Sequence, residues 1–149
     1  MGYLVDTNIL LRSCQPDHPM YPAALGAVEV LLRQGEKLHV SPQNIVEFWN
    51  VCTRPLDKNG LGMLPTEAAA EVTRFEALLP LKPDLPAIYE QWRDLVSRYA
   101  VKGVNVHDAR LVAVCIVHGL NQILTFNDRD FRRYTEINAV HPDTVNSSR

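Results

Sequence analysis

The sequence lacks an excess of basic residues, a long apolar run and any obvious leader. Its 149 residues carry 15 Lys and Arg against 17 Asp and Glu, which gives a formal net charge of −2. A protein that bound nucleic acid through bulk charge alone would be basic, so an anionic substrate would need a local patch or a bound metal. No apolar run approaches the ~20 residues of a membrane-spanning helix, and the N-terminus reads as the start of the fold. We therefore expect no membrane partner.

The cysteine and histidine patterns exclude two further classes of site. Cys14, Cys52 and Cys115 are odd in number and form no C-x-x-C pair, so neither a zinc ribbon nor a redox dithiol is expected. Cys52 and Cys115 fall in apolar helical stretches and should be buried thiols, which fits a reducing cytoplasm. The five histidines show neither H-x-H nor H-x₃-H spacing, which argues against a His-ligated metal.

Short apolar strands alternate with helices along the chain. Ser41 followed by Pro42 is a typical helix start, and Gly35 and Gly119 are typical helix stops. The pattern predicts one domain of residues 1–149 with a central parallel sheet covered on both faces. The expected strands are 2–5, 37–41, 122–126 and 137–142, and the expected helices are 7–12, 21–34, 42–54, 65–79, 84–100 and one that ends at Gly119.

Four acidic residues fall at one predicted edge of this sheet. Asp6 ends the first strand, and Asp128 follows the strand "ILTF". Glu47, in "SPQNIVEFWNV", and Asp108, in "VNVHDARLVAVCIVHG", lie on helices that start at the same edge. Ligands of parallel sheets gather beyond the carboxyl ends of the strands, so the four carboxylates are expected to converge.

Asp6 and Asp108 also have plain structural roles. Asp is a good N-cap, and Asp6 directly precedes an expected helix. If Asn105 is the N-cap of the later helix, Asp108 is its third residue, where the helix dipole favours an acid. Taken singly, each of these two roles is about as good an explanation as a functional one.

The other two acids are weaker signals when taken alone. Helical spacing puts Glu47 on one face with Asn44, Asn50 and Arg54, which is typical of a solvated surface. Asn127, Asp128 and Asp130 compete for one turn, and one of them should cap the short helical turn that holds Phe131. The functional interpretation rests on all four acids together.

A cluster of four carboxylates needs protons or a cation. Two bare charges ~4 Å apart repel by ~4 kcal/mol at an effective dielectric constant of ~20. Oxygen ligands without paired His or Cys suit Mg²⁺ or Mn²⁺. The natural chemistry of such a site is attack of metal-activated water on a phosphodiester.

Four segments of the chain, "VDTNILL", "SPQNIVEF", "VHDARLVAV" and "ILTFNDRDF", resemble the PIN-domain family from residue 3 to about residue 142. The resemblance implies a three-layer α/β/α sandwich around a parallel sheet. It implies an Mg²⁺- or Mn²⁺-dependent endoribonuclease that leaves 3′-hydroxyl and 5′-phosphate ends. A stand-alone chain of this size is similar to the VapC-type toxins, which pair with a small antitoxin protein and usually form homodimers. We therefore expect RNA, an antitoxin and a second copy as partners, in the cytoplasm.

The resemblance also assigns roles to individual residues. The catalytic acids are Asp6, Glu47, Asp108 and Asp128, and three of them, Asp6, Asp108 and Asp128, hold the metal directly. The remaining acid, Glu47, completes the cluster or orients the water.

Polar and basic neighbours complete the expected site. Thr7 and Asn8 match the polar residues after the first acid. Asn127 matches a position that some members use in place of the fourth acid, so Asn127 and Asp128 both stay open as the residue that faces the metal. The candidate RNA-binding cations are Arg110 and Arg129, followed by Arg12, Lys102, Arg132 and Arg133.

Two other functions fit parts of this pattern. The first is a non-catalytic PIN-fold module that binds RNA or protein without turnover. The second is a phosphotransfer domain of receiver or haloacid-dehalogenase type, which also gathers acids at a sheet edge. The dehalogenase pattern needs an acid two residues after the first, where this chain has Asn8.

Overall fold

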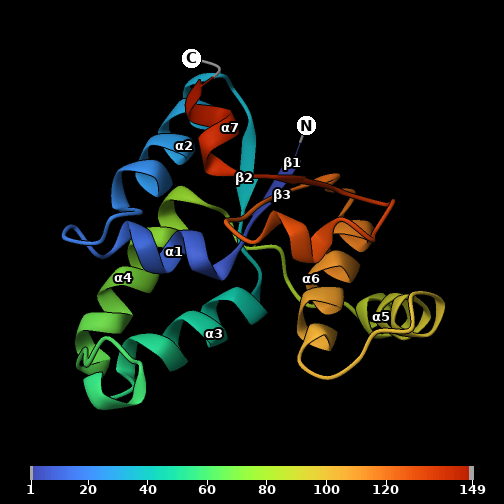
Figure 1. Cartoon of the computed structure of the whole chain (residues 1–149), viewed down its shortest axis with the longest axis horizontal. Coiled ribbons are helices and arrows are strands. Elements are labelled where there is room, and N and C mark those ends of the chain that lie inside the picture. Colours follow the sequence, from blue (N-terminus) through green and yellow to red (C-terminus); the bar gives the residue numbers. More distant parts are fainter. Residues whose placement is uncertain (1, 148–149) are drawn as a thin grey trace.

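The computed structural model describes residues 2–147 and has a four-stranded parallel sheet at its centre. The strand order is β2-β1-β3-β4, so the N-terminal strand occupies an inner position. Figure 1 shows the sheet between two groups of helices. The strands are β1 (Gly2–Val5), β2 (Lys37–His39), β3 (Gln122–Leu124) and β4 (Asn138–Val140). The helices are α1 (Thr7–Ser13), α2 (Tyr21–Arg33), α3 (Pro42–Thr53), α4 (Pro65–Leu78), α5 (Pro86–Arg98), α6 (Asn105–His118) and α7 (Pro142–Ser147), with 3₁₀ turns η1 (Leu56–Lys58) and η2 (Asp128–Phe131).

Alternate residues of the inner strands divide the hydrophobic core into two parts. Tyr3 and Val5 of β1 pack into the cluster beneath α1 to α4 and α7. Leu4 of β1 and Ile123 of β3 point the other way, into the cluster beneath α5 and α6. This two-residue alternation is what a strand buried on both faces produces. The expected three-layer α/β/α sandwich is confirmed.

Helix α6 is a central element because its sequence is apolar nearly all round. Five consecutive residues, Leu111 to Cys115, are buried, and Gly119 ends the helix in the left-handed region at φ 69°. Only a residue without a Cβ adopts that conformation at little cost. Cys52 and Cys115 are fully buried free thiols, as expected.

Several boundaries differ from the sequence-based expectation, and strands β2 and β3 each stop two residues earlier than expected. Val104 occupies the N-cap position of α6 and Asn105 is its first residue, so Asp108 is the fourth helical residue. Helix α5 begins at Pro86 rather than at residue 84. The last strand stops at Val140, and Pro142 opens the short helix α7, because proline fits the first helical turn and cannot donate to a sheet.

Within residues 2–147, no helix has both the length and the apolar character needed to cross a membrane.

Candidate functional site

Asp6 links the end of β1 to the start of α1 and is almost fully buried. Its backbone N–H donates to the carbonyl of Leu124 at 2.9 Å, which extends the pairing of β1 with β3. Its Oδ1 accepts from the Thr7 N–H at 2.7 Å, and its Oδ2 accepts from the Thr125 hydroxyl at 2.8 Å. Asp6 therefore is the helix cap that its position predicts, and its second carboxylate oxygen also accepts a hydrogen bond from the end of β3.

Burial raises the pKa of Asp6 to about 6, although the hydrogen bonds from Thr125 and Thr7 lower it. The charges of Glu47 and Asp130 raise this pKa further. A buried carboxyl group favours its neutral form because the low dielectric surroundings penalise the charge. Asp6 consequently keeps its proton to a higher pH than an exposed carboxyl group does.

Asp108 lies in the first turns of α6 and is half-buried. Burial is again the largest cause of a raised pKa, here to about 7, and the charges of Asp6, Asp130 and Glu47 add to it. Arg133 acts in the opposite direction. Asp6 and Asp108 come from elements about 100 residues apart in sequence, and they share two acidic neighbours.

Glu47 is not on a free surface, because both of its carboxylate oxygens accept hydrogen bonds. The Thr7 hydroxyl donates to Oε1 at 2.8 Å, and Gln43 Nε2 donates to Oε2 at 3.2 Å. The same Thr7 hydroxyl accepts from the side-chain amide of Asn44 at 3.3 Å. Asn44 is fully buried and closes a capping box with Ser41 at the start of α3. These contacts tie α3 to α1 at the acidic edge.

The turn η2 carries two acidic residues that interact with different groups. Asp128 forms an ion pair with Arg132 at 3.1 Å. Asp130, two residues later, is among the charges that raise the pKa of Asp6 and of Asp108. Asn127 occupies the N-cap position of η2 without a side-chain capping bond. Asp130 is thus an acid of η2 whose charge acts on Asp6 and Asp108, and the sequence pattern did not separate it from its neighbours.

Thr125 and Asn8 connect the start of α1 with the segment that follows β3. Thr125 is fully buried, and besides donating to Asp6 its hydroxyl accepts from Asn8 Nδ2 at 3.3 Å and from the Asn127 N–H at 2.9 Å. Asn8 Oδ1 accepts from the Phe126 N–H at 3.3 Å. Sequence reasoning missed Thr125, whose signal is a hydroxyl at the carboxyl end of an apolar strand.

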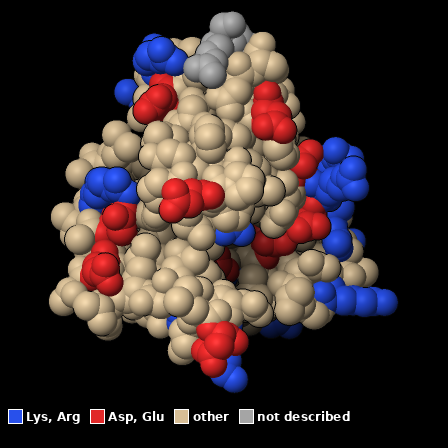
Figure 2. Space-filling model, turned by 60° about the vertical axis from the view of Figure 1, so that its left-hand side comes forward, with Lys and Arg blue, Asp and Glu red and all other residues tan. Residues whose placement is uncertain are grey.

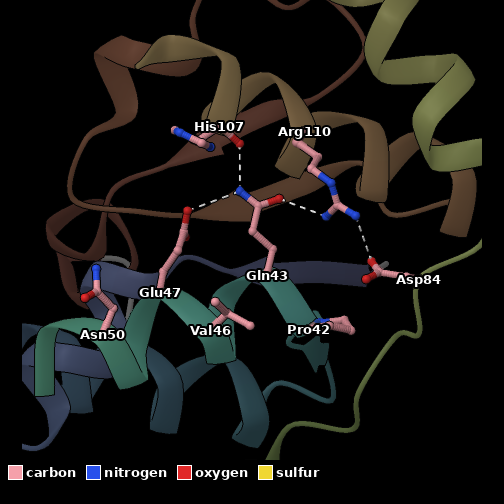
Figure 3. A pocket seen from close by; sticks show the side chains of 8 residues that line it. All are labelled: Pro42, Gln43, Val46, Glu47, Asn50, Asp84, His107 and Arg110. Carbon is pink, nitrogen blue, oxygen red and sulfur yellow. Dashed lines mark hydrogen bonds and ion pairs between the residues drawn. The ribbon is translucent and has the colours of Figure 1, made fainter. Parts of the chain in front are cut away.

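The two preferred RNA-binding arginines line different pockets. Arg110 lines a pocket of about 530 Å³ between α3 and α6, together with Gln43, Glu47 and His107 (Figure 3). Arg129 is exposed and lines a polar pocket of about 440 Å³ that also includes Asp130. Figure 2 shows a hollow with acidic residues in and beside it, and basic residues gathered farther along the same side.

The chemistry of the donors fits a hard divalent cation. Asp6, Glu47, Asp108 and Asp130 offer only carboxylate oxygens, which are the ligands that hard divalent cations prefer, and the raised pKa values of Asp6 and Asp108 arise first from burial and then from acidic neighbours. Residues 2–147 nevertheless contain no group of three or more His, Cys, Asp or Glu side chains arranged to hold a metal ion. The acids share an electrostatic environment but do not form a finished cage.

Several solved structures share this fold at low sequence identity. VapBC2 from Rickettsia felis, bound to a DNA fragment from its promoter, matches with a TM-score of 0.67 at 15% identity, covering 95% of this chain and 98% of that chain. VapBC-1 from nontypeable Haemophilus influenzae gives 0.67 at 14% identity, covering 96% and 99%. VapC20 from Mycobacterium tuberculosis, a sarcin-ricin loop cleaving toxin, gives 0.64 at 16% identity, covering 91% and 98%. These likenesses establish the fold.

The family follows from the sequence itself. A search of curated proteins gave no match. The PIN domain family model matches residues 3–137, which is nearly the whole chain and includes all the acids described above. The chain belongs to the PIN domain family.

Proposed function

We propose that this protein is a divalent-metal-dependent endoribonuclease that hydrolyses RNA phosphodiester bonds. One observation carries the proposal: Asp6 and Asp108, from distant parts of the chain, are linked electrostatically, since the charge of Asp6 raises the pKa of Asp108 and the charges of Glu47 and Asp130 raise the pKa of both. A divalent cation bound by these carboxylates would also bind phosphate oxygens, as Mg²⁺ and Mn²⁺ commonly do. The membership in the PIN domain family supports the same assignment.

Mg²⁺ or Mn²⁺ would be held by Asp6 and Asp108, with further negative charge from η2. When bound, the ion would supply an activated water and stabilise charge on the phosphodiester oxygens. Asp128 remains the candidate from the sequence pattern for the third ligand, and Asp130 is the candidate favoured by its effect on Asp6 and Asp108. Asn127 remains a candidate polar neighbour of the ion.

The chain's own residues orient these groups. Thr7 and Thr125 hold the Asp6 carboxylate by hydrogen bonds, and the Thr7 hydroxyl holds Glu47. Glu47 completes the acidic cluster or accepts a hydrogen bond from the attacking water. Arg110 and Arg129 lie beside the acids and would contact RNA phosphates, so local cations recruit a polyanion to a chain of net charge −2.

We further propose that the chain is the toxin of a toxin–antitoxin pair and works in the cytoplasm as a homodimer. Structures with this fold include VapBC pairs and a toxin–antitoxin complex from Klebsiella pneumoniae, matched with a TM-score of 0.64 at 19% identity. A small open reading frame next to this gene, whose product co-purifies with the chain, would support the pairing. Light scattering of the purified chain tests the dimer.

The direct test is cleavage of single-stranded RNA by the wild-type protein and by Asp6→Asn, with Mg²⁺, with Mn²⁺ and with a chelator. We expect cleavage that requires the metal and is lost in the variant, while the circular dichroism spectrum stays the same. Equal cleavage by both folded proteins would overturn the assignment.

A non-catalytic module that binds RNA or protein is the alternative. The observation in its favour is that residues 2–147 hold no preformed group of metal ligands. RNA affinity without cleavage under any divalent ion would support this alternative.

A further inference from the structure

Gln43 bridges α3 and α6 at the wall of the pocket that contains Glu47 (Figure 3). Its Nε2 donates to Glu47 Oε2 at 3.2 Å and to the backbone carbonyl of His107 at 2.9 Å. Its Oε1 accepts from Arg110 Nη1 at 3.1 Å. The amide therefore contacts one candidate catalytic acid and two consecutive turns of the helix that carries another.

These partners fix which way the amide points. Arg110 can only donate and the His107 carbonyl can only accept, so the Gln43 oxygen must face the guanidinium. Both amide hydrogens are then directed at the His107 carbonyl and at Glu47. A flipped amide would place its oxygen against two acceptors, which makes Gln43 an obligatory donor to Glu47.

Arg110 is itself anchored, since its Nη2 lies 3.3 Å from Asp84 Oδ1. Asp84, Arg110, Gln43 and Glu47 thus form one continuous chain of polar contacts across the pocket (Figure 3). At the far end, the Thr7 hydroxyl holds the second oxygen of Glu47. The Glu47 carboxylate is therefore held from two sides, by α1 and by the link to α6.

We propose that Gln43 is a positioning residue that orients the Glu47 carboxylate relative to Asp6 and Asp108 and thereby strengthens divalent-cation binding and the hydrolytic step. This inference rests on the proposed nuclease function and deepens it. Removing a residue that hydrogen-bonds to a carboxylate at a metal site typically changes metal affinity or activity by about 10- to 100-fold.

The contribution of Gln43 to folding should be small by comparison. Its pair with Glu47 at positions i and i+4 stabilises the helix by only ~0.2–0.5 kcal/mol, and its hydrogen bonds to His107 and Arg110 contribute about 0.5–1.5 kcal/mol each at most, because Gln43 lies at the edge of an open pocket where water can replace them. Gln43→Met keeps the length of the side chain but removes the donor and the acceptor. Asn50→Met is a matched control, because Asn50 lines the same pocket from the same helix and takes no part in the chain of contacts described above.

The test measures Mn²⁺ affinity by calorimetry and single-stranded RNA cleavage for wild type, Gln43→Met and Asn50→Met. For Gln43→Met we expect Mn²⁺ affinity and kcat each to fall by about 10-fold, with the melting temperature lowered by a few degrees at most. Asn50→Met should match wild type. If Gln43→Met fails to fold, Gln43→Ala is measured in the same way. Wild-type values of Mn²⁺ affinity and kcat in a folded Gln43 variant would overturn the proposal.

A double-mutant cycle separates positioning from a general structural effect. In the Glu47→Gln background, Gln43→Met should have no further effect on either quantity, because the two residues act as one unit. An undiminished loss in that background would also overturn the proposal. If the wild type shows no Asp6-dependent cleavage, the nuclease function fails, whereas the calorimetry still decides the role of Gln43.

Discussion

The hydroxyl of Thr125 donates a hydrogen bond of 2.8 Å to Oδ2 of Asp6, across 119 positions of sequence. Both residues are buried where β1 and β3 end side by side. Parallel pairing brings the two positions together, so the geometry of the first acid depends on a residue near the other end of the chain. The position of the Asp6 carboxylate therefore depends on the pairing of β1 with β3. A substitution at Thr125 should consequently affect Asp6.

Thr125→Val tests this dependence. The variant keeps the shape of the side chain but removes the hydroxyl that serves Asp6, Asn8 and the Asn127 N–H. Leaving buried polar groups without partners destabilises a protein by about 1–3 kcal/mol, so we expect a loss of that size in urea unfolding. Thr125→Ser keeps the hydroxyl and should retain most of the stability. A Val variant as stable as the Ser variant would contradict this role.

Asp6 predicts how the stability of the metal-free protein depends on pH. Its pKa rises from 3.8 to about 6 on folding, so the folded state holds the proton more tightly than the unfolded state. The associated stability is complete below about pH 4 and is lost as the pH rises through about 6. One pKa unit corresponds to ~1.4 kcal/mol, so the loss is on the order of 3 kcal/mol.

Chemical unfolding in a chelating buffer between pH 4 and pH 8 measures this loss. Asp108, whose pKa is raised to about 7, acts with the same sign and extends the decline to higher pH. Asp6→Asn does not titrate and should show a flatter profile. A wild-type stability that rises from pH 5 to pH 8 in the chelating buffer would contradict the assigned direction.

The two acids of η2 can be separated by a pair of substitutions. Asp130→Asn removes a charge that acts on both Asp6 and Asp108, so we expect weaker Mn²⁺ binding and a lower pKa for Asp108. Asp128→Asn removes the partner of Arg132, an exposed ion pair that contributes at most about 1 kcal/mol. Calorimetry and NMR titration measure both effects. A larger loss of Mn²⁺ affinity in Asp128→Asn would restore the assignment made from the sequence pattern.

The order of strands and helices and the position of Asp6 were predictable from the sequence because they depend on short stretches of neighbouring residues. An apolar strand that ends on Asp6 and a helix as apolar as α6 can be read without knowing the tertiary structure. Parallel pairing then places the strand ends at one edge. The helix start at Ser41 and Pro42 and the stop at Gly119 are equally local, and the structure confirms them.

The remaining contacts of the site depend on the directions of side chains, which the spacing of residues in the sequence does not define. Helical periodicity places Asn44 beside Glu47 on a polar face, yet Asn44 is buried because it caps α3 and contacts Thr7. Asp128 and Asp130 are two residues apart in a 3₁₀ turn, so the conformation of the turn alone decides which of them acts on Asp6. No periodic pattern exists in so short an element.

Divalent cations should stabilise the protein more at high pH than at low pH. At pH 5 protons occupy most of Asp6 and Asp108 and compete with the ion, whereas at pH 8 both carboxylates are ionised. A ligand at 100 times its dissociation constant raises the unfolding free energy by ~2.7 kcal/mol. We therefore expect Mn²⁺ to raise the melting temperature by several degrees at pH 8 and by much less at pH 5. Asp6→Asn is the control and should lose most of the shift at pH 8, and equal shifts in the variant and the wild type would place the cation elsewhere on the protein.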